Sequence, residues 1–271
     1  MPFAFDHHPA TMLVRKLDSM AALSDDEREA VARLPLRVQS LDARRDIVRD
    51  GDRSLRCCLL LRGWVCRYKL ISEGRRQIIS FHHPGDLPDL QTLYLPVADY
   101  GLATLTNATV GFIAHDSLQA LAEEFPVVGS LLWRSMLIDA SVCRAWMVGM
   151  GRRSAFEQVA HLFCETYLKL HAIGLADDYR CPMPITQVDL ADALGLTSVH
   201  VNRVLKDLRS KSLVTLRNHT LVFDGWDELL RISEFDPTYL QLKSEGRDEP
   251  SPSAGARGNR EPGHRELTSV C

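Results

Sequence analysis

The clearest pattern of apolar and polar positions lies in residues 185–223, which predict a helix-turn-helix followed by a β-hairpin. Thr186 and Asp189 have the spacing of a capping box, which starts a helix. Gly195 suits the left-handed conformation that ends a helix, and Thr197 suits the cap of the next one. Apolar residues then give each helix an inward face: Leu190, Ala193 and Leu194 in the first, and Val201, Val204, Leu205 and Leu208 in the second.

The second predicted helix has a different outward face, formed by Ser198, Val199, Asn202, Arg203 and Lys206. A single helix fits the major groove of DNA, where base edges are read by such side chains. Arg203 has the fork that binds guanine O6 and N7, and Asn202 has the amide that pairs with adenine N6 and N7. Four cations in residues 197–211 stand against one anion, Asp207, so the predicted surface is locally basic.

Two short predicted strands follow, around Val214–Leu216 and Leu221–Phe223, and their turn is the wing of a winged helix. This placement predicts a set of residues that hold the DNA backbone: Gln187, Thr197, Lys206, Arg217 and His219. Lysine and arginine on a short helix pair are also common on ordinary solvated surfaces. A winged helix that contacts only protein is therefore a rival interpretation of the same pattern.

The remaining chain alternates between helical and strand patterns. Ser24 and Glu27 have capping-box spacing and predict a helix after a ragged N-terminal lead. Residues 36–115 contain short β-rich runs separated by glycine-containing turns, which is typical of a jelly-roll β-sandwich. From there to Gly149 the pattern is helical, broken at Phe125-Pro126, and an apolar line near heptad spacing predicts contact with a second copy: Leu132, Met136, Ala140, Cys143 and Met147.

The last third is predicted in smaller pieces. Ser154 caps a helix that continues to about His171, and a loop over residues 174–184 leads to the helix-turn-helix. Residues 226–235 predict one more short helix. Residues 244–271 are rich in serine, glycine, proline and mixed charge, a composition typical of disorder.

Composition narrows the classes of protein. The chain has 271 residues, which suggests two domains, and a net charge of −3, so affinity for nucleic acid must come from a local basic face. No stretch is long and apolar enough to span a membrane, and the N-terminus lacks the pattern of a signal peptide. Seven cysteines at irregular spacing fit a reduced compartment better than a disulfide scaffold. We therefore expect a cytoplasmic protein.

Three segments resemble the Crp/Fnr family of bacterial transcription regulators: GWVCRYKLISEGRRQIISFHHPGDLPDLQTL, GRRSAFEQVAHLF and LADALGLTSVHVNRVLKDLRSKSLV. The resemblance covers roughly residues 12–240. It implies an α+β architecture with an N-terminal helix and cyclic-nucleotide-binding-like jelly roll (1–115), a dimerisation helix (116–150) and a winged helix-turn-helix (151–243). It also implies a homodimer on double-stranded DNA with a palindromic site, half-sites about 34 Å apart, and RNA polymerase as a partner if the protein activates transcription.

Departures from the family pattern bear on the effector. Family members that bind cyclic AMP carry a Gly-Glu pair and then an Arg-Ser or Arg-Thr pair; here Asp89-Leu90 and Asp99-Tyr100 stand at those places. A cyclic phosphate would meet a carboxylate and no arginine, so we expect no control by cyclic AMP. No cysteine precedes Cys57, which argues against the iron–sulfur cluster of the oxygen-sensing branch.

Other departures leave alternatives open. Haem through His82 or His83 is one, although a histidine beside a turn is more often a surface residue. Cys57 and Cys58 are either redox-active or core-filling, and an apolar strand favours the core. Many family members carry a glutamate where Val199 stands; Val199 cannot accept from cytosine N4 as that glutamate does, and can contact only a thymine methyl. We predict no cofactor and no metal.

Two further functional classes remain as rivals. A ligand-sensing adaptor would bind protein through its winged helix, and its binding would not weaken steeply with salt as DNA binding does. An enzyme is disfavoured because the chain has no phosphate-binding glycine loop, GxSxG or HExxH motif. The only cluster of catalytic residue types, His82 and His83 with Asp86 and Asp89, is explained equally well by turn polarity. In the expected mechanism, the Gly149–Gly151 segment is a hinge that re-aims two DNA-reading units.

Overall fold

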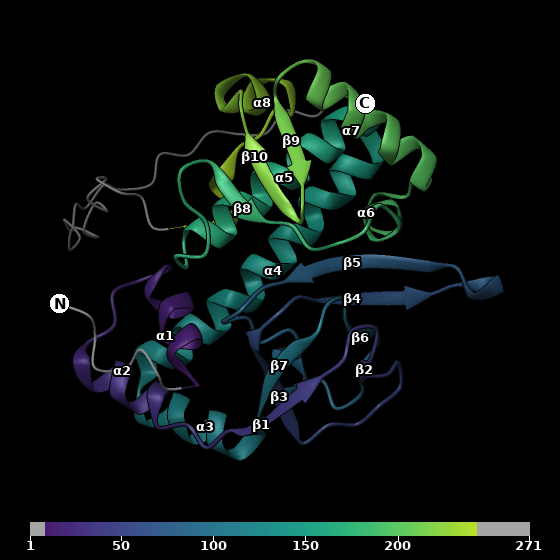
Figure 1. Cartoon of the computed structure of the whole chain (residues 1–271). Coiled ribbons are helices and arrows are strands. Elements are labelled where there is room, and N and C mark those ends of the chain that lie inside the picture. The colour runs from purple at the N-terminus through teal and green to yellow at the C-terminus, as the bar shows by residue number, and fades with distance from the viewer. Residues whose placement is uncertain (1–8, 243–271) are drawn as a thin grey trace, which may run out of the picture.

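The computed structural model describes residues 9–242 and begins with two short helices, α1 (Thr11–Asp18) and α2 (Asp25–Ala32). Ser24 and Glu27 form the predicted capping box of α2. The sequence pattern does not predict α1, an eight-residue helix whose buried residues Leu13 and Leu17 pack in the same core as the next helices. Figure 1 shows both helices beside the β-rich half of the molecule.

The β-rich half is the predicted sandwich, with one sheet in the order β1-β7-β3 and the other in the order β2-β6-β4-β5. All pairings within these sheets are antiparallel. The strands are β1 (Arg37–Leu41), β2 (Asp46–Val48), β3 (Arg56–Arg62), β4 (Val65–Leu70), β5 (Arg76–His82), β6 (Gly101–Thr104) and β7 (Ala108–Ala114). Two short 3-10 turns, η1 (Ser72–Gly74) and η2 (Leu90–Leu93), connect them.

The apolar run CCLLL lies in strand β3, and its side chains face two different cores. Cys58 and Leu60 point into the core between the two sheets, whereas Cys57 and Leu59 point to the core shared with α1 and α2. Since successive side chains of a strand point to opposite faces, both faces of β3 are buried. The prediction that the two cysteines fill the core is confirmed, because neither is exposed to solvent.

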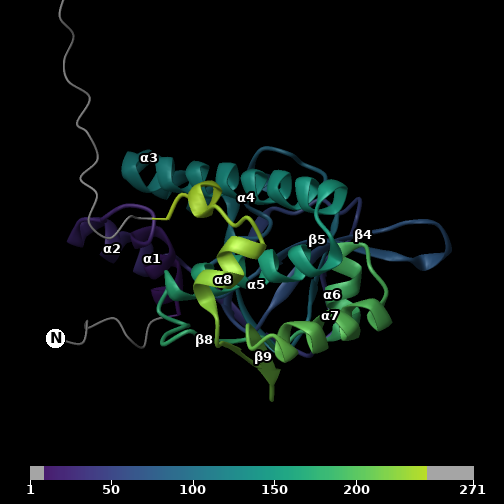
Figure 2. The ribbon, with the colours of Figure 1, turned by 90° about the horizontal axis from the view of Figure 1, so that it is seen from above.

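Two helices link the sandwich to the C-terminal part: α3 (His115–Glu124) and the 27-residue α4 (Pro126–Arg152). The break falls at Phe125-Pro126 as predicted, and Pro126 takes the first helical position, where its missing N–H costs nothing. The predicted hinge at Gly149–Gly151 is instead part of the last turns of α4, and the chain leaves the helix at Arg153. Figure 2 shows α4 lengthwise.

The C-terminal unit (residues 154–242) contains α5 (Ala155–His171), β8 (Arg180–Pro182), α6 (Gln187–Leu194), α7 (Ser198–Ser210), β9 (Val214–Arg217), β10 (Thr220–Phe223), α8 (Trp226–Ile232) and η3 (Pro237–Leu240). Ser154 caps α5 as predicted. The predicted loop over residues 174–184 contains a three-residue strand, because β8 lies within it and pairs with β10. Its sheet has the order β8-β10-β9.

One apolar cluster crosses from the C-terminal unit into the sandwich. It joins Phe163 of α5 and Leu190 of α6 to Cys66, Ile78 and Phe81 of strands β4 and β5. The two parts therefore share buried surface. Within residues 9–242, no helix combines the length and the hydropathy that crossing a membrane requires. The predicted disordered tail, residues 244–271, lies outside the described residues.

Candidate nucleic-acid interface

Local hydrogen bonds set the angle between α6 and α7. The hydroxyl of Thr186 accepts the N–H of Asp189 at 3.2 Å, and the Asp189 carboxylate accepts the N–H of Thr186 at 3.0 Å, which confirms the capping box. Gly195 has φ +67°, a left-handed conformation that glycine adopts without strain. The hydroxyl of Thr197 then caps α7 by accepting the N–H of His200. The predicted helix-turn-helix is confirmed in each of these details.

Helix α7 has the two faces that the sequence predicts. Val201, Val204 and Leu208 are buried in the core of the C-terminal unit. Ser198, Arg203 and Lys206 are exposed, and 70% of the Val199 surface is in contact with solvent. In Figure 1, α7 lies at the outside of the C-terminal unit, away from the sandwich. The outward face is therefore open to a large partner in this structure.

Helix α6 contributes to the same surface through a side-chain contact. Asn202 is half-buried, and its Nδ2 atom donates a hydrogen bond to Oε1 of Gln187 at 3.1 Å. Gln187 is exposed at the first position of α6. The sequence predicts both residues for the interface but does not predict that they contact each other.

The wing is a tight hairpin of β9 and β10. Asn218 and His219 form its two-residue turn, with φ of +49° and +59°, as a type I′ turn requires. The carbonyl of His219 accepts the N–H of Met183 at 2.7 Å, so the neighbouring strand β8 holds the turn. Arg217 and His219 are both exposed there. The structure thus places all nine predicted interface residues on α6, its loop to α7, α7 or the wing turn.

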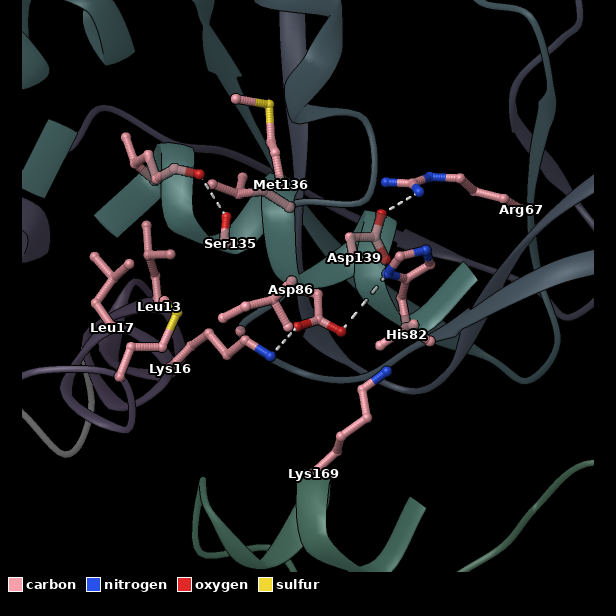
Figure 3. A pocket seen from close by; sticks show the side chains of 16 residues that line it. Leu13, Lys16, Leu17, Arg67, His82, Asp86, Ser135, Met136, Asp139 and Lys169 are labelled. Carbon is pink, nitrogen blue, oxygen red and sulfur yellow. Dashed lines mark hydrogen bonds and ion pairs between the residues drawn. The ribbon is translucent and has the colours of Figure 1, made fainter. Parts of the chain in front are cut away.

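A second polar region lies at the junction of the sandwich, α1, α4 and α5, around a cavity of about 60 Å³. In Figure 3, the Lys16 ammonium contacts Asp86 at 2.8 Å, and Arg67 contacts Asp139 of α4. Lys169 of α5 points into the same space. Although burial opposes its charge, the surrounding carboxylates raise the pKa of Lys169. A cavity of this size has room for a few water molecules beside these charged groups.

Arg67 connects three elements near the positions where the sequence departs from the family pattern. Its Nε atom donates to the carbonyl of Pro88 at 2.5 Å, and its guanidinium lies over the ring of Tyr100. Tyr100 and Leu90 are buried, and Asp99 is exposed. Asp89 is also buried, and burial raises its pKa to about 7 although the N–H of Cys58 donates to it at 2.7 Å.

The two histidines considered for haem were expected at the surface, but both are buried. His82 shares a hydrogen bond with Ser80 at 2.8 Å and lies 3.7 Å from Asp86, and burial lowers its pKa. His83 is buried edge-on against Trp64, with ring centroids 4.3 Å apart. The 60 Å³ cavity beside His82 has no room for a porphyrin. Within residues 9–242, no group of three or more metal-binding side chains comes together.

The outer face of α4 carries an exposed seam with heptad spacing, formed by Trp133, Leu137, Ala140, Arg144 and Met147. The predicted line differs, because Leu132 is buried in the core with α1 and Met136 packs beside it. The predicted line is therefore displaced by one residue at Leu132, Met136 and Cys143, which are buried or half-buried, while Ala140 and Met147 remain on the exposed face. Leu137 is 64% exposed. Alternating steps of four and three residues are the spacing of a coiled-coil interface.

Two family models match the chain. One describes the Crp-like helix-turn-helix domain and matches residues 157–232. The other describes the cyclic nucleotide-binding domain and matches residues 38–125. Together they cover the C-terminal unit with its interface and the β-sandwich.

Individual proteins agree with these models. The nitrogen fixation regulation protein FixK of Rhizobium meliloti (strain 1021) is 28% identical over 174 residues, which are 64% of this chain and 76% of that protein. The transcriptional activator protein FnrL of Cereibacter sphaeroides is 24% identical over 214 residues, 76% of this chain and 84% of the relative. The solved structure of FixK2 from Bradyrhizobium japonicum has a TM-score of 0.66 and 26% identity, covering 73% of this chain and 98% of its own.

Proposed function

Because this chain belongs to the Crp/Fnr family of transcription regulators, we propose that it binds a palindromic DNA site as a homodimer and reads it with α7. Like its relatives, it is a DNA-binding regulator and not an enzyme. The observation that carries the proposal is the outward face of α7, where amide, guanidinium and ammonium groups surround an exposed apolar side chain.

In this proposal the interface residues divide into two groups. Ser198, Val199, Asn202 and Arg203 contact base edges, with Arg203 on guanine and Val199 against a thymine methyl. The backbone is held by Gln187, Thr197, Lys206, Arg217 and His219. The exposure of eight of these residues, and the positions of all nine at the start of α6, at the cap of α7, along α7 and in the wing turn, support this division.

Dimerisation is proposed through the exposed seam of α4. A line of side chains at heptad spacing, apolar except for Arg144, is suited to pack against its own copy around a two-fold axis. Two copies of α7 would then meet successive major grooves. The C. sphaeroides relative is named a transcriptional activator, and RNA polymerase is the proposed partner if this chain also activates.

We also propose that cyclic AMP is not the effector. Asp99 stands where the resemblance implies an arginine, and the Arg67 guanidinium beside the neighbouring Tyr100 is already paired with Asp139. Leu90 stands where the family has the ribose-binding glutamate and is buried. The position thus offers neither a free cation to a phosphate nor a carboxylate to a ribose.

The experiment selects sites from a library of palindromes and compares variants by fluorescence anisotropy. Arg203→Ala is expected to weaken the selected site by about 5- to 150-fold, since a bidentate base contact is worth about 1–3 kcal/mol. Arg209→Ala, an exposed arginine in the last turn of the same helix, is the matched control and should change affinity little. Equal binding by Arg203→Ala and wild type would overturn the base-reading role. Absence of any salt-sensitive DNA affinity in the wild type would favour the protein-binding adaptor.

A further inference from the structure

Four charged residues join the sandwich to the helix-turn-helix, and we name them the interdomain clasp: Arg44, Arg76, Asp189 and Asp192. The guanidinium of Arg44 donates to both carboxylate oxygens of Asp189, at 2.5 and 2.8 Å. Arg76 donates to Asp189 through Nη2 and to Asp192 through Nε, each at 2.8 Å. The two carboxylates lie one helical turn apart on α6, so both arginines grip one side of this helix.

The arginines are held by the sandwich itself. Arg44 lies in the turn between β1 and β2 with φ +64°, and its N–H donates to the carbonyl of Thr104 on β6 at 2.9 Å. Arg76 is the first residue of β5 and pairs with Leu70 of β4. Next to it, Gln77 donates from Nε2 to the carbonyl of Ala193 near the end of α6 at 3.1 Å. Figures 1 and 2 both show α6 against β5.

Asp189 is the central residue of the clasp and has no exposed surface. Burial alone would raise its pKa, but hydrogen bonds from Arg44 and Thr186 hold the pKa well below its usual value, so the carboxylate is charged. The Arg44 side chain is 45% exposed, but the carboxylate that it holds is fully buried, so a displaced arginine would leave a desolvated charge behind. Arginine forks add direction to the contact. The clasp therefore fixes an angle as well as a distance.

The covalent link between α4 and the C-terminal unit passes through Arg153, and Gln158 of α5 donates to the Arg153 carbonyl at 2.9 Å. Trp146 of α4 adds a hydrogen bond to Glu165 of α5 at 3.1 Å, and η3 also packs against α4. The apolar cluster shared with β4 and β5 holds the unit against the sandwich, but apolar contacts are non-directional. The ion pairs of Asp189 and Asp192, on the helix next to α7, add directional contacts to this attachment.

We infer that Arg44 and Arg76 are positioning residues for DNA recognition, and that the clasp determines which half-site spacing the dimer accepts. This inference rests on the proposed function. Each half of a two-fold dimer carries its own clasp, so any rotation of α7 relative to α4 is repeated in both halves and changes the separation of the two reading helices. One base pair more or less moves a half-site by about 3.4 Å. A dimer whose two DNA-reading units are held rigidly binds such a site weakly. A dimer without the clasp can adjust the separation of its reading helices to the new spacing.

The test measures binding to palindromes whose central spacer is shortened or lengthened by one base pair. For wild type, each change is expected to weaken binding by roughly tenfold or more, the size of effect of one mismatched base pair. For Arg44→Ala and Arg76→Ala, the penalty is expected to fall below about threefold. Arg75→Ala, an exposed neighbour in the same hairpin, is the matched control and should keep the wild-type penalty.

A charge exchange and a DNA-free measurement separate this role from simple loss of stability. Arg76→Asp combined with Asp192→Arg should restore part of the spacing preference, although each single change abolishes it. Hydrogen exchange without DNA should become faster in β5 and α6 of Arg76→Ala and stay unchanged in β3 and β7. An unchanged spacing penalty in both alanine variants would overturn the inference. If wild type binds no palindrome, the proposed function fails, and unchanged exchange in α6 then overturns the clasp separately.

Discussion

The Nδ2 atom of Asn202 donates a hydrogen bond to Oε1 of Gln187 at 3.1 Å, which joins α7 to the first residue of α6. The contact leaves the Asn202 carbonyl and its second N–H available, and these are the two groups that a bidentate pairing with adenine requires. The contact restricts the Asn202 rotamer before DNA arrives. A restricted side chain loses less entropy on binding than a mobile one.

Gln187→Ala is therefore expected to weaken binding to the selected palindrome by about three- to tenfold, since ordering one side chain costs roughly 0.5–1.5 kcal/mol. The preference at the base pair that Asn202 reads should also relax. Anisotropy titrations with single-base variants of the site measure both effects. In the double variant Gln187→Ala/Asn202→Ala, the first change should add nothing to that base preference. Additive losses in preference would show that Gln187 reads a base edge on its own, independently of Asn202.

The exposed seam of α4 gives a prediction for assembly. Leu137→Glu should raise the dimer dissociation constant by about a hundredfold or more, since an unpaired carboxylate in a buried interface costs roughly 3–5 kcal/mol. Sedimentation equilibrium measures the change. The control is Gln119→Glu, which adds the same charge to an exposed position of α3. A Leu137→Glu protein that remains a dimer at micromolar concentration would place the interface elsewhere.

The pair of Arg67 and Asp139 gives a prediction for stability. Asp139→Asn leaves a buried guanidinium without its counter-charge and should lower the free energy of unfolding by about 3–5 kcal/mol. Urea unfolding measures this loss. Asp50→Asn removes the partner of Lys69, a solvent-exposed pair at 2.7 Å, and should cost less than about 1 kcal/mol. Equal losses in the two variants would mean that Arg67 reaches solvent when Asp139 is neutralised.

The buried His161 gives a prediction for pH dependence. Burial lowers its pKa to about 4 from 6.5, so the unfolded chain binds more protons than the folded one between these values. Stability is therefore complete above pH 6.5 and falls as the pH drops towards 4, by about 1.4 kcal/mol per pH unit for this residue. In His161→Phe the slope of unfolding free energy against pH should decrease by that amount. Urea unfolding at pH 5, 6 and 7 measures the slope, with exposed His200→Gln as the control; an unchanged slope in His161→Phe would contradict the assignment.

The sequence predicted best those features that depend on neighbours within a few positions. The caps at Ser24, Ser154 and Thr186, the left-handed Gly195 and the two faces of α7 are all local, and all are confirmed. The sandwich and the family were also recognised from short segments. The individual roles of the nine interface residues stay predictions, although the structure exposes eight of them and half-buries Asn202.

Features that depend on distant parts of the chain were missed. Arg44 and Asp189 are 145 positions apart, and no periodicity connects them. His82 ends β5 and His83 follows it near a turn, a place that suggests exposure, but His82 faces a cavity lined by α1, α4 and α5 and His83 packs against Trp64. The seam of α4 was placed on Leu132 because the core beneath α4 is as apolar as its outer face. The length of β8, three residues, gives too short an alternation for a strand to be predicted from sequence.

Asp189 closes the first turn of α6 and also receives two arginines from the other half of the molecule. A capping box tolerates glutamate as readily as aspartate, so the local rule alone would permit the longer acid at this position. The forks of Arg44 and Arg76 do not, since an added methylene would displace a fully buried carboxylate from the two arginines that it pairs with. Asp189→Glu should thus keep α6 helical and yet set the two halves of the molecule at a different angle. One added carbon atom would leave the helix folded but change its orientation relative to the sandwich.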